Sequence, residues 1–249
     1  MSGHSKWHNI RLRKARVDAQ RGKIFTKLAR EIIMAARQGG GDPGANTRLR
    51  DTVQRAREAS MPQDNITRAI QRGTGELPGV QYDEVVYEGY GPGGVAIIMQ
   101  ALTDNRNRTV SELRSLLSRH GGNLGEAGCV AWMFNPRGVI IVPRDQIGED
   151  ALLEIVLDAG GQDLKADQAS YEITTRPEDF ENVKSALGAN DLAPESAELT
   201  LVPQSTITVT GKEGEQTLRL MDALEDHDDI QHVYANFDIP ESVMEEAAA

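Results

Sequence analysis

The change in apolar spacing at Pro78 and Gly79 constrains the fold of this chain more than any other feature. Before it, apolar residues recur at helical intervals, as at Ile24, Leu28 and Ile32, which is the pattern of amphipathic helices. After it, short apolar runs alternate with helical patterns, which is typical of mixed α/β structure. The sequence therefore predicts a helical N-terminal segment followed by an α/β region.

The N-terminal segment predicts three helices. The first covers residues 18–38 and ends at the glycine-rich run Gly39–Pro43, because glycine and proline stop helices. The second covers about 46–60, and the third covers 62–73. Together they predict a small basic helical domain over residues 1–77.

The rest of the chain predicts two ferredoxin-like domains, one inserted into the other. Residues 138–203 show the order strand, helix, strand, strand, helix, strand, which is the ferredoxin-like order. Residues 78–137 and 204–240 predict a discontinuous second domain of the same kind, and 241–249 form a tail. The expected fold class is thus α/β (α+β type), with three domains.

The discontinuous domain is predicted from strand-like runs and two helical patterns. A glycine-rich turn joins a hairpin, and Thr109 and Glu112 have the spacing of a capping box, which predicts a helix start. The expected strands are 82–88, 95–102, 129–134, 206–209 and 230–235. Cys129 is expected to pack in the core of its strand. Gly89, Gly91 and Gly94 fit G-x-G-x-x-G, but a strand follows them, so a hairpin turn is favoured over a dinucleotide site.

The charges of this chain are segregated. The 249 residues sum to −11, yet residues 1–75 hold 16 Lys and Arg against 6 Asp and Glu, and the remainder holds 11 against 32. Such asymmetry predicts a segment that faces nucleic acid, joined to a body that repels it. We expect the acidic domains to offer a surface for a protein partner.

The N-terminal arm is the strongest candidate site. Closely spaced cations gain free energy by releasing counterions from a polyphosphate, and an indole can stack on an unpaired base. The predicted nucleic-acid contacts are Lys6, Trp7, Arg11, Arg13, Lys14, Arg16, Arg21, Lys23, Lys27 and Arg30. The alternatives are a solvated tail for the arm and, for Trp7, docking on its own domain.

Two further groups of cations have a functional and a structural interpretation. The second and third helices carry Arg48, Arg50, Arg55, Arg57, Arg68 and Arg72, which bind phosphate or form an ordinary solvated face. Arg106 and Arg108 lie near a helix start, where they contact a phosphate or an acidic partner, or belong to a polar connection.

The acidic run 225–229 could supply oxygen ligands to a divalent cation, but nothing in it fixes a coordination geometry, so a solvated helix end is favoured. We expect this run to face away from nucleic acid. No pair of Cys and His residues has zinc spacing, and no common catalytic motif occurs. The predictions are no enzyme activity, no metal, no cofactor and no small-molecule substrate.

The apolar runs are only a few residues long, far short of the roughly 20 that a membrane helix needs. The first residues are polar and then basic, unlike a secretory signal. We therefore expect a cytoplasmic protein without a membrane partner.

Several blocks resemble the YebC/PmpR family. They are Gly3–Trp7, Arg21–Leu28, Gly39–Pro43, Tyr87–Gly94, Thr103–Val110, His120–Leu124 and Leu224–Asp229. The blocks cover almost the whole chain and are sparse only in residues 138–203. The resemblance implies a helical N-terminal domain and two ferredoxin-like domains. It also implies a cytoplasmic DNA-binding transcriptional regulator, while related members, including a mitochondrial translational activator, are linked to the ribosome.

Three hypotheses follow. The favoured one is a DNA-binding transcriptional regulator. The alternative is a translation factor that binds ribosomal RNA through the same arm. The third is a protein adaptor whose basic face meets an acidic partner.

Overall fold

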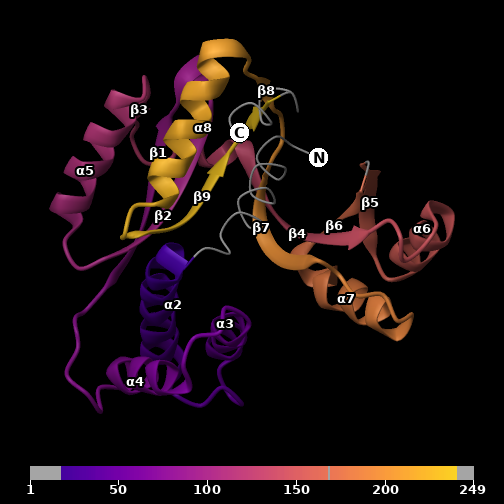
Figure 1. Ribbon diagram of the computed structural model, residues 1–249, viewed down its shortest axis with the longest axis horizontal. Helices are drawn as coiled ribbons and strands as arrows, with labels where there is room; N and C mark the ends of the chain where they lie inside the picture. Colours follow the sequence, from indigo (N-terminus) through magenta and orange to yellow (C-terminus); the bar gives the residue numbers. More distant parts are fainter. Residues whose placement is uncertain (1–17, 168, 240–249) are drawn as a thin grey trace. The chain divides into compact units, whose positions relative to one another are not determined.

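The computed structural model describes residues 18–167 and 169–239, which divide into two compact units. The larger unit comprises residues 18–131 and 207–239, and the insert unit comprises residues 132–206. Figure 1 shows the elements of both. No described helix combines the length and the apolar character that crossing a membrane requires.

The larger unit begins with the three predicted helices, α2 (Asp18–Gly39), α3 (Thr47–Glu58) and α4 (Gln63–Thr74). Buried apolar side chains such as Ile32, Leu49 and Ile66 join them in one core. The buried side chain of Asn46 caps α3 by accepting the N–H of Leu49, and it donates to the carbonyl oxygens of Ala35 and Gly40 at the end of α2. The helix boundaries predicted from the sequence agree with these within two residues.

A close approach of α2 and α4 depends on Gly73. A Cβ atom at this position would lie 2.5 Å from the carbonyl oxygen of Ile33. Only a residue without a side chain permits this spacing.

The main sheet of the larger unit has the strand order β3-β1-β2-β9. Its strands are β1 (Asp83–Tyr90), β2 (Ala96–Thr103), β3 (Asn123–Leu124) and β9 (Ile230–Ala235). The helices α5 (Arg106–Arg119) and α8 (Gly211–Glu225) pack together on one face of it. Ile97, Met99 and Leu117 are fully buried in this core. The predicted hairpin is confirmed, because β1 pairs with β2 in antiparallel register across the short 3₁₀ turn η1 (Pro92–Gly94).

The predicted strand 206–209 does not belong to this sheet. β8 (Ile207–Thr208) pairs instead with β10 (Phe237–Asp238) in a separate parallel pair. β1, predicted as the partner of β2 in the hairpin, lies between β2 and β3, with all eight of its residues opposite β2.

The predicted strand 129–134 is also wrong. Residues 131–133 form the 3₁₀ turn η2 (Ala131–Met133), Cys129 is only half-buried, and Trp132 is 69% exposed. The buried carboxylate of Glu88 accepts the backbone N–H groups of residues 128, 130 and 131 at 2.6, 2.7 and 2.8 Å. A strand in this stretch would need those N–H groups for hydrogen bonds to a neighbouring strand. Because Glu88 accepts them, the stretch does not join a sheet.

Glu88 is ionised in the fold despite its burial. Desolvation raises the pKa of Glu88, but the hydrogen bonds from the three backbone N–H groups lower it by more. The pKa therefore lies below its ordinary value. Burial and the charge of Glu88 raise the pKa of the nearby Cys129 thiol. The thiol is therefore not activated for nucleophilic attack.

The insert unit has the strand–helix order predicted for it. Its strand order is β5-β6-β4-β7, with antiparallel neighbours. The elements are β4 (Phe134–Pro143), α6 (Glu149–Asp158), β5 (Gly161–Ala166), β6 (Ser170–Thr175), η3 (Pro177–Asp179), α7 (Phe180–Ala189) and β7 (Ser196–Pro203). Both helices pack on the face that carries Ile140 and Ile173. The separation of the larger unit into a helical and an α/β domain remains a prediction.

The carboxylate of Glu88 generates a first prediction. The substitution Glu88→Gln places an NH₂ group opposite at least one backbone N–H group, and it should lower the free energy of unfolding by about 1–3 kcal/mol. Urea denaturation measures this change. Glu126→Gln, at an exposed position of the same turn, is the control and should change stability little; equal effects of the two substitutions would contradict the assigned role.

Candidate functional site

The basic face of α2 contacts the end of α8 and the turn that follows it. We call residues 225–229 the acidic segment. Lys27 Nζ donates to the carbonyl oxygen of Glu225 at 2.5 Å, and Lys23 Nζ lies 3.5 Å from the carbonyl oxygen of Asp226 and 3.8 Å from its carboxylate. Carbonyl groups at a helix C-terminus carry partial negative charge. The end of α8 therefore attracts both lysines through its backbone as well as its side chains.

Arg30 is the most deeply engaged of these cations. Its Nη1 lies 2.6 Å from the carbonyl oxygen of Asp228 and 2.9 Å from Asp229 Oδ1. Its guanidinium also lies over the ring of Tyr82, 5.3 Å from the centroid. Only 16% of the Arg30 side chain is exposed. Arg30 thus holds α2 to the acidic segment and offers little surface to an external ligand.

Asp229 connects α2 to α5. Its carboxylate accepts Arg30 on Oδ1, and Arg108 Nη2 at 2.8 Å and Thr109 Oγ1 at 2.7 Å on Oδ2. Burial raises the pKa of Asp229, but the hydrogen bonds from Arg108, Thr109 and Arg30 outweigh it and hold the pKa below its ordinary value. The same contact raises the pKa of Arg108. The two arginines thus balance the charge of this carboxylate and offset the cost of burying it.

The start of α5 differs from the predicted capping box. Asn105 is the N-cap, since its side chain accepts the N–H of Arg108 at 3.1 Å, and the helix begins at Arg106. Thr109 lies inside the helix and is buried. Its hydroxyl donates to Asp229 and contacts Thr103 Oγ1 at 2.7 Å. The threonine therefore serves the contact with Asp229 and not the cap.

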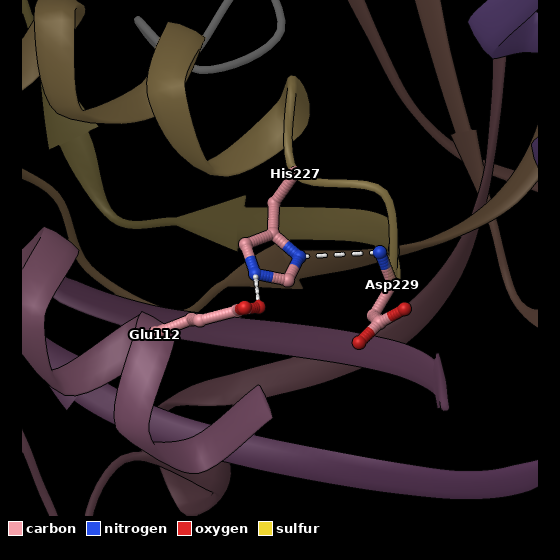
Figure 2. A group of neighbouring side chains, drawn as sticks. All are labelled: Glu112, His227 and Asp229. Carbon is pink, nitrogen blue, oxygen red and sulfur yellow. Dashed lines mark hydrogen bonds and ion pairs between the residues drawn. The ribbon is translucent and has the colours of Figure 1, made fainter. Parts of the chain in front are cut away.

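His227 supports the conformation of the acidic segment (Figure 2). The backbone N–H of Asp229 donates to His227 Nδ1 at 3.1 Å, so the proton of the neutral ring lies on Nε2. Nε2 in turn lies 3.0 Å from Glu112 Oε2. The imidazole, with its side chain 11% exposed, bridges the acidic segment to α5.

The ligand atoms of Glu112, His227 and Asp229 lie within 4.8 Å of one another, a spacing that a metal ion can bridge. Both oxygens of Asp229 already accept donors from Arg30, Arg108 and Thr109. A metal ion would have to displace these donors and the Nε2 proton of His227. The arrangement fits a hydrogen-bond array better than a coordination shell.

A cavity of about 800 Å³ lies beside this array. The cationic residues that line it are Lys23, Arg30, Arg108 and Arg119, and the anionic ones are Glu112, Asp226, Asp228 and Asp229. Since the charges balance, the cavity does not select an anion. The expectation that the acidic segment faces away from nucleic acid conflicts with its position against α2, whose cations are among the predicted contacts.

The other predicted site residues fall into three groups. Lys6, Trp7, Arg11, Arg13, Lys14 and Arg16 lie outside the described residues, and Arg21 lies in α2 with a side chain outside the described part. Lys23 keeps 51% of its side chain exposed. Arg106 pairs with Asp83 at 2.9 Å, and Arg108 pairs with Asp104 as well as Asp229.

The arginines of α3 and α4 divide by their pairing. Arg48 pairs with Glu84, and Arg55 pairs with Glu31. Three others are exposed, and no carboxylate in the described part of the chain forms an ion pair with them. They are Arg57, Arg68 and Arg72. Their charge is therefore available to a ligand.

Because two arginines balance the charge of the Asp229 carboxylate, removing that charge should have a large effect on stability. Asp229→Asn leaves two arginines without their shared carboxylate and should lower the free energy of unfolding by roughly 2–4 kcal/mol, less than for a fully buried pair because Arg108 is partly exposed. Urea denaturation measures the loss. Asp104→Asn removes the other, exposed partner of Arg108 and should cost less than about 1 kcal/mol; a loss as large as that of Asp229→Asn would refute the central role of Asp229.

The lowered pKa values of Asp229 and Glu88 predict an acid-dependent stability. Both groups bind protons more readily in the unfolded chain, so their stabilisation is complete above the unfolded pKa of about 4 and is lost as the pH falls through the folded pKa. Unfolding free energy measured against pH should fall more steeply below about pH 4 for the wild type than for Asp229→Asn. Parallel curves would contradict the prediction.

Known proteins resemble this chain over nearly its full length. Residues 5–76 match the TACO1/YebC protein N-terminal domain, and residues 82–237 match the TACO1/YebC second and third domain. A protein of Syntrophobacter fumaroxidans is 54% identical over 249 residues and covers 100% of both chains. A protein of Pelotomaculum thermopropionicum is 56% identical over 241 residues, which cover 96% of this chain and 99% of that one. Both bear the name "Probable transcriptional regulatory protein".

A solved structure has the same fold. The crystal structure of the conserved hypothetical protein Aq1575 from Aquifex aeolicus matches with a TM-score of 0.80 and 47% identity, over 91% of this chain and 94% of that one. The names of these relatives describe no catalytic activity. Together with the two domain matches, these similarities show that the chain belongs to the TACO1/YebC family.

Proposed function

We propose that this protein is a cytoplasmic regulator of gene expression that binds nucleic acid, and that DNA is its target. The observation that carries the proposal is the excess of 16 basic over 6 acidic residues in the first 75 positions. The relatives named as probable transcriptional regulatory proteins support it. The protein acts by binding and not by catalysis.

The binding surface combines the N-terminal arm with the unpaired arginines of the helices. The arm residues Arg11, Arg13 and Lys14 contact phosphates, and their binding releases condensed counterions. Arg68 and Arg72 add guanidinium groups that can grip phosphate oxygens through two parallel hydrogen bonds. Their exposure supports this role.

The structure favours a narrower set of contacts than the charge pattern alone. Arg30 is occupied by Asp228 and Asp229, so we assign it to holding the unit together. Arg108, which pairs with the buried carboxylate of Asp229, is assigned in the same way, whereas Arg106 keeps 61% of its side chain exposed and remains a contact. Lys23 remains a contact because half of its side chain is exposed.

A ribosome-associated translation factor is the alternative function. The exposed cations recognise phosphate, which DNA and RNA share. The acidic domains would bind a protein partner in either case, because their charge repels the polymer.

The arm is tested by salt titration of binding to a labelled DNA duplex. Replacing Arg11, Arg13 and Lys14 by Ala should reduce the log–log salt slope by about 2–3 units, since each phosphate contact contributes ~0.7–0.9. The control replaces Lys165, Lys184 and Lys212, which are exposed and lie elsewhere in the chain, with the same loss of charge. Equal slopes for the two triple variants would remove the arm from the mechanism.

The helices are tested by single substitutions. Arg68→Ala removes an unpaired cation and should lower the slope by ~0.7–0.9, whereas Arg48→Ala removes one already paired with Glu84 and should lower it less.

The same titration with ribosomal RNA identifies the polymer. Tighter binding of RNA than of DNA, together with salt-sensitive sedimentation alongside ribosomes, would establish the translation factor. If the protein binds neither polymer at any salt concentration, both functions are refuted.

A further inference from the structure

The contact between α2 and the acidic segment is much stronger at one end than at the other. At the inner end, Arg30 and Asp229 have side chains only 16% and 3% exposed. At the outer end, Lys23 and Asp226 have side chains 51% and 53% exposed, and their charged atoms lie 3.8 Å apart. Exposed ion pairs of this kind contribute little to stability. The outer contact can therefore open while the inner one stays closed.

The acidic segment presents backbone carbonyl oxygens and, at its outer end, the carboxylate of Asp226 to α2. Oxygens of Glu225, Asp226 and Asp228 take up donors from Lys27, Lys23 and Arg30. Lys23 and Lys27 are four residues apart, about 6 Å along one face of the helix. Both lysines lie among the predicted phosphate contacts. A phosphate chain that binds Lys23 must displace the acidic segment from it.

We propose that the acidic segment is an autoinhibitory competitor for nucleic acid at Lys23. Nucleic acid opens the outer contact and takes Lys23, and the buried pair of Arg30 and Asp229 keeps the segment close enough to rebind. The segment thereby weakens loose contacts with polyanions, because a ligand must meet several cations at once to displace it. This inference rests on the proposed function.

The inference is tested with Asp226→Asn, which removes the exposed charge opposite Lys23 and leaves the Arg30–Asp229 pair intact. Affinity for a short labelled DNA duplex and for an RNA hairpin should rise about two- to fivefold, the range expected for release of one exposed ion pair. The control is Glu154→Gln in α6, an exposed acid of the insert unit with the same charge change. It should alter affinity less, because Glu154 is not the carboxylate that pairs with Lys23.

A double-substitution cycle separates local competition from a general charge effect. In a Lys23→Ala background, Asp226→Asn should give no gain beyond that of Glu154→Gln, because the cation for which the segment competes is gone. Thermal unfolding confirms that the variants fold.

The outcomes distinguish this inference from the function on which it rests. If the wild type binds both probes and Asp226→Asn equals Glu154→Gln, the competition is refuted and the proposed function stands. A gain in affinity that persists in the Lys23→Ala background also refutes the competition. If the wild type binds neither probe, the proposed function fails, and the competition fails with it.

Discussion

The ionised, buried carboxylate of Asp229 is the interaction on which the rest of the larger unit depends. It accepts Arg30 from α2, and Arg108 and Thr109 from α5. The backbone of the same residue accepts the N–H of Leu102 from β2 at 2.8 Å. A buried charge without such partners would be strongly destabilising. Helix α2, helix α5 and the main sheet must therefore keep the arrangement that brings these donors together.

This constraint changes the meaning of the charge pattern. Counting charges along the chain treats every lysine and arginine of the basic segment as available. In the structure Arg30, Arg48 and Arg55 face carboxylates of the same unit, and these cations stabilise the fold. The unpaired cations and those in exposed pairs, such as Lys23, form the external positive surface, so pairing and exposure decide which part of the segment can bind a polymer.

Local patterns were sufficient for the helices and for the insert unit. The apolar spacing of Ile24, Leu28 and Ile32 needs only the period of an α-helix, and the insert unit has the order of strands and helices that its sequence shows. The failures arose where a side chain from a distant position decides the local structure. Glu88 accepts the backbone N–H groups of residues 128, 130 and 131, which lie some forty positions away, and no pattern within that stretch indicates this.

The same cause explains what the sequence missed at the candidate site. Thr109 has the spacing of a cap, and only the position of Asp229, 120 residues later, shows that its hydroxyl is committed elsewhere. The run 225–229 looks like a solvated helix end, because nothing near it reveals that α2 packs there. A signal was available in the opposite charges of the two segments, since an acidic run and a basic helix in one chain attract each other unless the fold keeps them apart.

The exposure gradient along the contact follows from its position at the edge of the core. Arg30 lies seven residues further along α2 than Lys23, two turns closer to the buried centre of the helical core. The low dielectric around Arg30 strengthens its attraction to Asp229, whereas water screens the attraction between Lys23 and Asp226. One helix can thus carry a permanent structural ion pair at one end and an exchangeable one at the other. A fold that needs both a rigid connection and a binding surface can therefore obtain them from a single row of cations, provided that the row runs from the core to the solvent.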